Sequence, residues 1–198
     1  KLKDCLYILG GSKIEDNIAL LKNKNIITCG LFGQVCTIAK GYNLGAQNKF
    51  LKNELKVIPK LKRHLNHIQT PKDFAVKIKN KRKDLPLEEF PSKYEIFDIG
   101  PKTRKIYIVK IKKAKAIFLK GTAGYCEDNK FCIGTKAIIK AIERSKTNSV
   151  LSGGHTISAI KRFKINKNRV GYISLSGGAT IHYLAGEKLP GLEVLKHV

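Results

Sequence analysis

The stretch CLYILGGSKIEDN, residues 5–17, combines the features of a strand, a tight turn and a helix. A short apolar run of strand length leads into two glycines, and the residues after them have helical spacing. Glycine after a strand permits a positive φ and close approach of a ligand, and the following helix presents unpaired backbone amides. The stretch therefore predicts a strand–turn–helix unit. Its corner, the glycine-containing turn between the strand and the helix, suits a bound anion.

The same unit recurs along the chain. Apolar runs of strand length lie at residues 5–9, 26–29, 74–78, 94–99, 116–119, 149–151 and 170–174. Helical patterns lie at residues 13–22, 33–40, 48–65, 103–113, 131–145, 156–163 and 179–186. This alternation is typical of crossover units on a parallel sheet. We therefore predict an α/β fold of three layers, a Rossmann-like and mostly parallel sheet with helices on both faces, formed by residues 1–198 as a single domain.

Glycines follow most of these strands, and loops at that edge of a parallel sheet bind ligands. Three corners suit a phosphate: GGSKIEDN (10–17), SGGHTIS (152–158) and SLSGGAT (174–180). We expect Lys13 one turn into a helix that begins near Ser12, and His155 or Thr156 as the cap of another helix. Each corner alone is a weak signal, because the same residues also occur without a ligand. The lysine can be an ordinary first-turn residue, the histidine can cap a helix, and the glycines can allow close helix packing.

The formal charge of +24 would attract a polyanion. Only six of the 39 basic residues are arginine, the better residue for bidentate readout, and the lysines are scattered without interleaved aromatics. A solvated lysine-rich surface is therefore favoured over a nucleic-acid site. The densest basic run, KIKNKRK at residues 77–83, is predicted to be an exposed loop.

The cysteines and the hydropathy pattern indicate the compartment. The five cysteines are odd in number and lack the CxxC spacing of zinc sites; they are Cys5, Cys29, Cys36, Cys126 and Cys132. We predict reduced cytosolic thiols, with Cys5 and Cys29 as small core residues. No window is long and apolar enough to span a membrane, and no cleavage-site pattern opens the chain. The prediction is a soluble, cytoplasmic protein without a membrane partner.

Taken in order, the glycine corners resemble phosphoglycerate kinase. The matching segments are GGSK (10–13), CGLFG (29–33), KGTAGYCE (120–127), SGGHT (152–156), SGGA (176–179) and LAGEKLPG (184–191). TPKD (70–73), DIGPKT (98–103) and FCIGT (131–135) also look like family segments, so the match spans essentially the whole chain. The DIGPKT and GGHT forms look closest to archaeal members. The resemblance implies the C-terminal, nucleotide-binding half of the enzyme.

The resemblance also implies a ligand, ADP or ATP with Mg²⁺, and a role for each corner. Phosphates and part of the base pocket would meet Gly10, Gly11, Ser12 and Lys13; the adenine would lie against Gly30 and Gly121; a buried Glu127 would accept the ribose hydroxyls; and the phosphates would be cradled by Gly153, Gly154, His155 and Thr156. The implied reaction is reversible phosphoryl transfer between 1,3-bisphosphoglycerate and MgADP. Lys13 and the amides of Gly154, Gly177 and Gly178 would stabilise charge on the transferred group.

Several positions depart from the family pattern. Asn17 stands where many members have a second lysine, and Lys120 and Thr122 replace the asparagine and proline of an NGP segment. His155 replaces an aspartate that binds magnesium, so we predict no protein metal ligand and a metal held by phosphates and water. The chain has no Met, and no basic phosphoglycerate patch precedes Lys1. We therefore expect a fragment that binds nucleotide with little turnover, 3-phosphoglycerate being bound by an absent N-terminal domain; the alternative is a free-standing, non-catalytic nucleotide-binding module.

Overall fold

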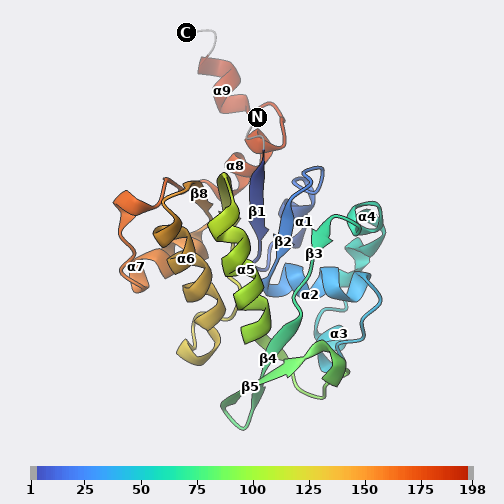
Figure 1. Cartoon of the computed structure of the whole chain (residues 1–198). Helices are drawn as coiled ribbons and strands as arrows, with labels where there is room; N and C mark the ends of the chain where they lie inside the picture. Colours follow the sequence, from blue (N-terminus) through green and yellow to red (C-terminus); the bar gives the residue numbers. More distant parts are fainter. Residues whose placement is uncertain (1–3, 196–198) are drawn as a thin grey trace.

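The computed structural model describes residues 4–195, and its centre is a parallel sheet (Figure 1). The strand order is β3-β2-β1-β7-β8-β9. The strands are β1 (Cys5–Leu9), β2 (Ile26–Thr28), β3 (Ile68–Gln69), β7 (Ala116–Lys120), β8 (Asn148–Ser152) and β9 (Tyr172–Ser174). Because all their pairings are parallel, the carboxyl ends of these strands meet at one edge.

Helices cover both faces of this sheet, which confirms the predicted fold class. Along β1, Leu6 and Ile8 belong to one core cluster, and Cys5, Tyr7 and Leu9 belong to another. This period of two places alternate side chains on opposite faces. The first face is covered by α5 (Pro101–Lys113), α6 (Ile133–Ser145) and α7 (Gly154–Arg162), with α5 and α6 in front in Figure 1. The second is covered by α1 (Ile14–Ile18), α2 (Gly30–Ala39), α4 (Ile58–Leu61) and α8 (Gly177–Leu184).

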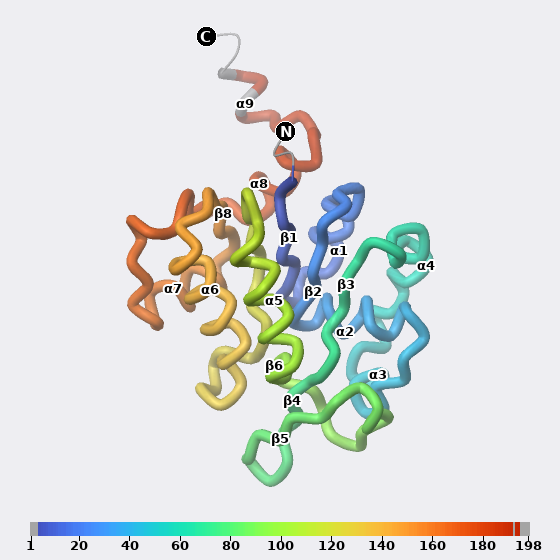
Figure 2. The backbone as a smooth tube through the Cα atoms, in the orientation of Figure 1, coloured from blue at the N-terminus to red at the C-terminus, as the bar shows by residue number. Residues whose placement is uncertain are grey.

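A second, antiparallel sheet corrects two of the strand predictions. Its order is β5-β4-β6, formed by β4 (Asp73–Ile78), β5 (Lys81–Pro86) and β6 (Ile96–Ile99). The segments at 74–78 and 94–99 therefore lie outside the parallel sheet. The basic run at 77–83 is not a loop but a hairpin, which projects at the end of the molecule away from α9 (Pro190–Leu195) (Figure 2). Lys79 and Asn80 form its turn with φ of 44° and 61°, the left-handed geometry that two-residue hairpin turns need.

An ion pair fastens this hairpin to the rest of the molecule. Arg82 Nη1 donates to Asp98 Oδ2 at 2.8 Å, and the side chains are 11% and 0% exposed. Asp98 also accepts the amides of Ile99 and Gly134. Burial raises the pKa of Asp98, while the hydrogen bonds from Gly134 and Arg82 oppose that rise. The pair thus joins β5, the end of β6 and the start of α6.

The helix predicted at 48–65 is broken into short pieces. They are α3 (Ala46–Phe50), η1 (Glu54–Val57), α4 and η2 (Lys62–His64). Pro59 lies in the first turn of α4, where its missing amide is tolerated but a continuous helix would lose a hydrogen bond. The remaining elements are η3 (Leu87–Glu89), η4 (Asn129–Phe131), η5 (Lys167–Arg169) and α9 (Pro190–Leu195). Within residues 4–195, no helix is both long enough and apolar enough to cross a membrane.

Candidate functional site

A cavity of about 690 Å³ opens at the carboxyl edge of the parallel sheet. This volume is typical of small-molecule sites. Every predicted site residue except Thr156 lines it, namely Gly10, Gly11, Ser12, Lys13, Gly30, Gly121, Glu127, Gly153, Gly154, His155, Gly177 and Gly178. The fold therefore brings together corners that are far apart in the sequence.

Backbone hydrogen bonds join the first corners to the loop after β7. The amides of Gly10 and Gly11 donate to the carbonyls of Lys120 and Thr122, at 2.7 and 2.9 Å. Gly121 has φ of +79°, and a Cβ there would lie 2.4 Å from the Gly10 carbonyl carbon. Glycine is therefore required for this contact. Since their amides are already used, Gly10 and Gly11 can offer a ligand close approach but not these two donors.

The start of α7 differs from the predicted cap. The N-cap is Gly153 with φ of 100°, and no side chain caps the helix, so the prediction of His155 or Thr156 as the cap is wrong. Thr156 is fully buried, and its Oγ1 accepts the amide of Gly121 at 3.0 Å. Its hydroxyl therefore holds the corner after β7 against the corner after β8, and its side chain lies outside the cavity lining.

The N-termini of α7 and α8 meet in the cavity. In α7 the amide of Ile157 donates to Gly153, and in α8 the amide of Thr180 donates to Ser176. The amides before these two have no acceptor within their own helices, because helix geometry provides none. A Cβ at Gly177 would lie 3.5 Å from Gly153 Cα, so the two corners are in contact. Two positive dipole ends that converge in this way favour a bound anion.

Two lysines line the same cavity. Lys13 is exposed and is the N-cap residue of α1, not a residue one turn into the helix as predicted. Lys120 ends β7 with a side chain only 6% exposed and forms an ion pair with Asp16 at 3.0 Å. Burial lowers the pKa of Lys120, and the hydrogen bond that Lys120 donates to Asp16 opposes the decrease. In the sequence, Lys120 stands out only as a departure from a motif.

Asn17 lies behind the first corner. It is fully buried, and its Nδ2 donates to the Gly10 carbonyl at 3.1 Å. Its side chain therefore supports the turn after β1, and Asn17 is not part of the cavity lining.

The cavity also has an apolar wall, which the sequence did not predict. It is formed by Leu31, Phe50, Ile96, Phe97 and Tyr125. The rings of Phe97 and Tyr125 meet edge to face with centroids 5.9 Å apart. Such a wall suits a flat apolar group. It comes largely from α3 and β6, which the broken helix and the second sheet place next to the glycine corners.

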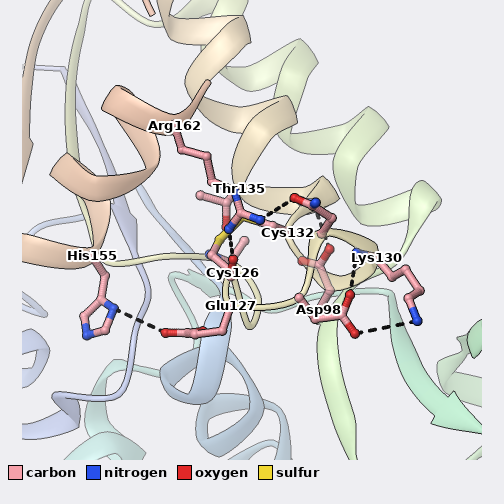
Figure 3. Close-up of a disulfide and its surroundings, with 12 residues drawn as sticks. Asp98, Cys126, Glu127, Lys130, Cys132, Thr135, His155 and Arg162 are labelled. Atoms are coloured by element: carbon pink, nitrogen blue, oxygen red, sulfur yellow. Dashed lines mark hydrogen bonds and ion pairs between the residues drawn. A yellow bond between two sulfur atoms is a disulfide. The ribbon is translucent and has the colours of Figure 1, made fainter. Parts of the chain in front are cut away.

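A disulfide closes the loop next to this wall (Figure 3). Cys126 and Cys132 are bonded, so the prediction of reduced thiols is wrong for these two cysteines. Cys5, Cys29 and Cys36 are free and buried. Arg162 of α7 donates to the Cys126 carbonyl and to Asn129 Oδ1. A separation of six residues matches no metal or redox motif, and only the turn of the loop brings the two Cα atoms to 4.4 Å.

Glu127 lies in the same loop and points toward His155 (Figure 3). Its Oε1 is 4.0 Å from His155 Nδ1, and the two side chains are 54% and 77% exposed. The expectation of a buried carboxylate is therefore wrong, because the loop that carries Glu127 is at the cavity mouth. Residues 4–195 contain no group of three or more His, Cys, Asp or Glu side chains placed to hold a metal ion.

Comparison with known proteins identifies the family. Residues 1–187 match the family model for phosphoglycerate kinase. The curated phosphoglycerate kinases of Methanothermus fervidus and Pyrococcus furiosus are 40% and 37% identical over 98% of this chain. The chain spans about half the length of these relatives, 50% and 51%.

Solved structures agree with these relatives. The crystal structure of phosphoglycerate kinase from Pyrococcus horikoshii has a TM-score of 0.91 at 34% identity, covering 99% of this chain and 52% of that one. The structure from Coxiella burnetii has a TM-score of 0.83 at 27% identity, covering 99% and 53%. With a cavity that unites the corners on which the resemblance rested, the chain belongs to the phosphoglycerate kinase family.

Proposed function

We propose that residues 1–198 form the C-terminal, nucleotide-binding half of a phosphoglycerate kinase and that the cavity binds ADP or ATP. One observation carries the proposal: the contacting N-termini of α7 and α8 share a cavity with an aromatic wall. Helix ends favour phosphates, and the wall favours a base. A nucleotide has both kinds of group.

The lining residues divide between the parts of the ligand. Phosphates would accept hydrogen bonds from the first-turn amides of α7 and α8, including those of Gly154, Gly177 and Gly178. The adenine would lie against the apolar wall, near Gly30 and Gly121. Glu127, at the cavity mouth, would accept the ribose hydroxyls. Lys13 would stabilise charge on the transferred phosphoryl group, since an exposed lysine can turn toward a phosphate at the open side.

Magnesium would bind mainly through the nucleotide. Asp16 lines the cavity, but its Oδ2 is paired with Lys120. Glu127 lies beside His155 rather than beside a second carboxylate. Magnesium keeps several waters and often takes its ligands from substrate phosphates, so these side chains fit a metal that arrives with the nucleotide.

The proposed reaction transfers a phosphoryl group between 1,3-bisphosphoglycerate and MgADP, in glycolysis and gluconeogenesis, in the cytoplasm where these metabolites occur. In-line transfer requires that donor and acceptor be held together. We assign 3-phosphoglycerate to the other half of the enzyme, the N-terminal domain. Residues 1–198 alone are therefore expected to bind nucleotide and to turn over little.

Calorimetry tests the binding function. Titration of MgADP into the chain should give saturable binding at one site, and a duplex RNA should bind only weakly and only at low salt. The salt dependence separates the alternatives, because polyanion binding to a basic surface falls steeply with salt. Tight, salt-sensitive RNA binding without saturable ADP binding would show that the charge of +24, not the cavity, determines the function.

A further inference from the structure

Lys120 is a cation in an unusual place. Its side chain is 6% exposed, yet the residue lines the cavity. A buried ammonium loses hydration, so it needs partners that replace water. Among residues 4–195, Asp16 is the only hydrogen-bond acceptor of Lys120 Nζ. One carboxylate oxygen leaves part of the donor capacity of an ammonium unused.

The position of Lys120 in the sheet places it between the phosphate corners. On β1 its register partner is Leu9, directly before Gly10, and on β8 it is Ser152, directly before Gly153. The next residue, Gly121, is tied to Thr156 of α7. The Lys120 side chain therefore starts between β1 and β8, and its ammonium lies 3.0 Å from Asp16, which also lines the cavity. Lys13, by contrast, is exposed.

We propose that Lys120 Nζ binds a phosphate oxygen of the nucleotide, with Asp16 as its counter-ion before the nucleotide binds. This inference rests on the proposed function. It assigns a second positive charge to the phosphate end of the cavity, and this charge is carried by Lys120 at the end of β7. Asn17, on α1, cannot supply that charge because its amide is neutral and its Nδ2 is bonded to the Gly10 carbonyl.

The test compares ADP with adenosine, which lacks phosphate. Replacement Lys120→Met should weaken ADP binding about tenfold, because a charge-assisted hydrogen bond is lost, and should leave adenosine binding unchanged. Lys115→Met is the matched control. Lys115 precedes the same strand at its opposite end, is 79% exposed and is also paired with an aspartate, Asp4, at 3.3 Å.

The outcomes separate this inference from the proposed function. If the parent chain binds ADP and Lys120→Met binds it equally well, the inference is wrong and the proposed function stands. If Lys115→Met loses as much affinity as Lys120→Met, the effect is one of net charge and the inference is again wrong. A parent that binds neither ADP nor adenosine overturns the proposed function, and this inference with it.

Variants of Asp16 cover the case in which Lys120→Met fails to fold. The double variant Asp16→Asn/Lys120→Met removes both charges and should show the same tenfold loss for ADP. Asp16→Asn alone should bind ADP at least as well as the parent, because it removes a negative charge and leaves Lys120 free for the phosphate. A tenfold loss in Asp16→Asn would show that the ion pair acts only on structure and would overturn the assignment.

Discussion

Replacement of Arg82 with methionine is expected to lower the free energy of unfolding by about 3 to 5 kcal/mol, the usual effect of removing one partner of a buried ion pair. Asp98 would keep its carboxylate in a fully buried position without its counter-ion. Arg82 also donates to the carbonyls of Ile99 and Lys130, and these bonds would be lost as well. Urea denaturation at pH 7 measures the change.

The pH dependence identifies the cause. Burial already raises the pKa of Asp98, and loss of Arg82 would raise it further above the unfolded value. A carboxyl group with a raised pKa favours folding when it is protonated. The loss in free energy of unfolding caused by Arg82→Met should therefore shrink as the pH falls from 7 to 4. Lys81→Met, an exposed neighbour in the same hairpin, should change stability by less than about 0.5 kcal/mol. Equal losses of stability for the two variants would contradict the role of the ion pair between Arg82 and Asp98.

Replacement of Gly121 with alanine is expected to lower the free energy of unfolding by about 3 kcal/mol and to abolish most ADP binding. The positive φ of +79° costs a residue with a Cβ about 1 to 2 kcal/mol. The Cβ would also meet the backbone of Gly10 at 2.4 Å, and such overpacking costs about 1 to 3 kcal/mol. Relief of that contact would separate the first corner from the corner after β7, so the cavity would lose its shape.

Gly178→Ala is the matched control for stability. Gly178 lies in the first turn of α8, and a Cβ there meets no atom within 4 Å. Thermal denaturation should therefore show a change of less than about 0.5 kcal/mol for this variant. If Gly121→Ala is as stable as Gly178→Ala, the close approach of the two corners does not hold the site together.

The glycine corners were predictable because each depends on only a few adjacent residues. An apolar run, a glycine pair and a helix start are local features, and a parallel sheet brings its carboxyl ends to one edge whatever the strand order. The corners at Gly10, Gly153 and Gly177 were therefore placed correctly in one cavity. Thr156 and Glu127 were harder, because their burial depends on loops that the local pattern does not describe.

The second sheet and the apolar wall were not predictable in the same way. An apolar strand such as β4 has the same sequence pattern whether its partner is parallel or antiparallel. Its partner β6 also lies further along the chain, beyond the hairpin. The hairpin at Lys79 and Asn80 contains no Asn-Gly signal, so the lysines read as a loop. Phe97 and Tyr125 form the wall only because the second sheet lies against the loop after β7.

Backbone amide resonances of the ¹⁵N-labelled chain, followed during titration with ADP, test whether the glycine corners form one nucleotide site. We predict that the amides of Gly154, Gly177 and Gly178 shift together and saturate with a single dissociation constant, because all three lie at the contacting N-termini of α7 and α8. Lys110, Lys112 and Lys113 on α5 should not shift. Shifts confined to that basic helix, with the glycine amides unchanged, would contradict the site.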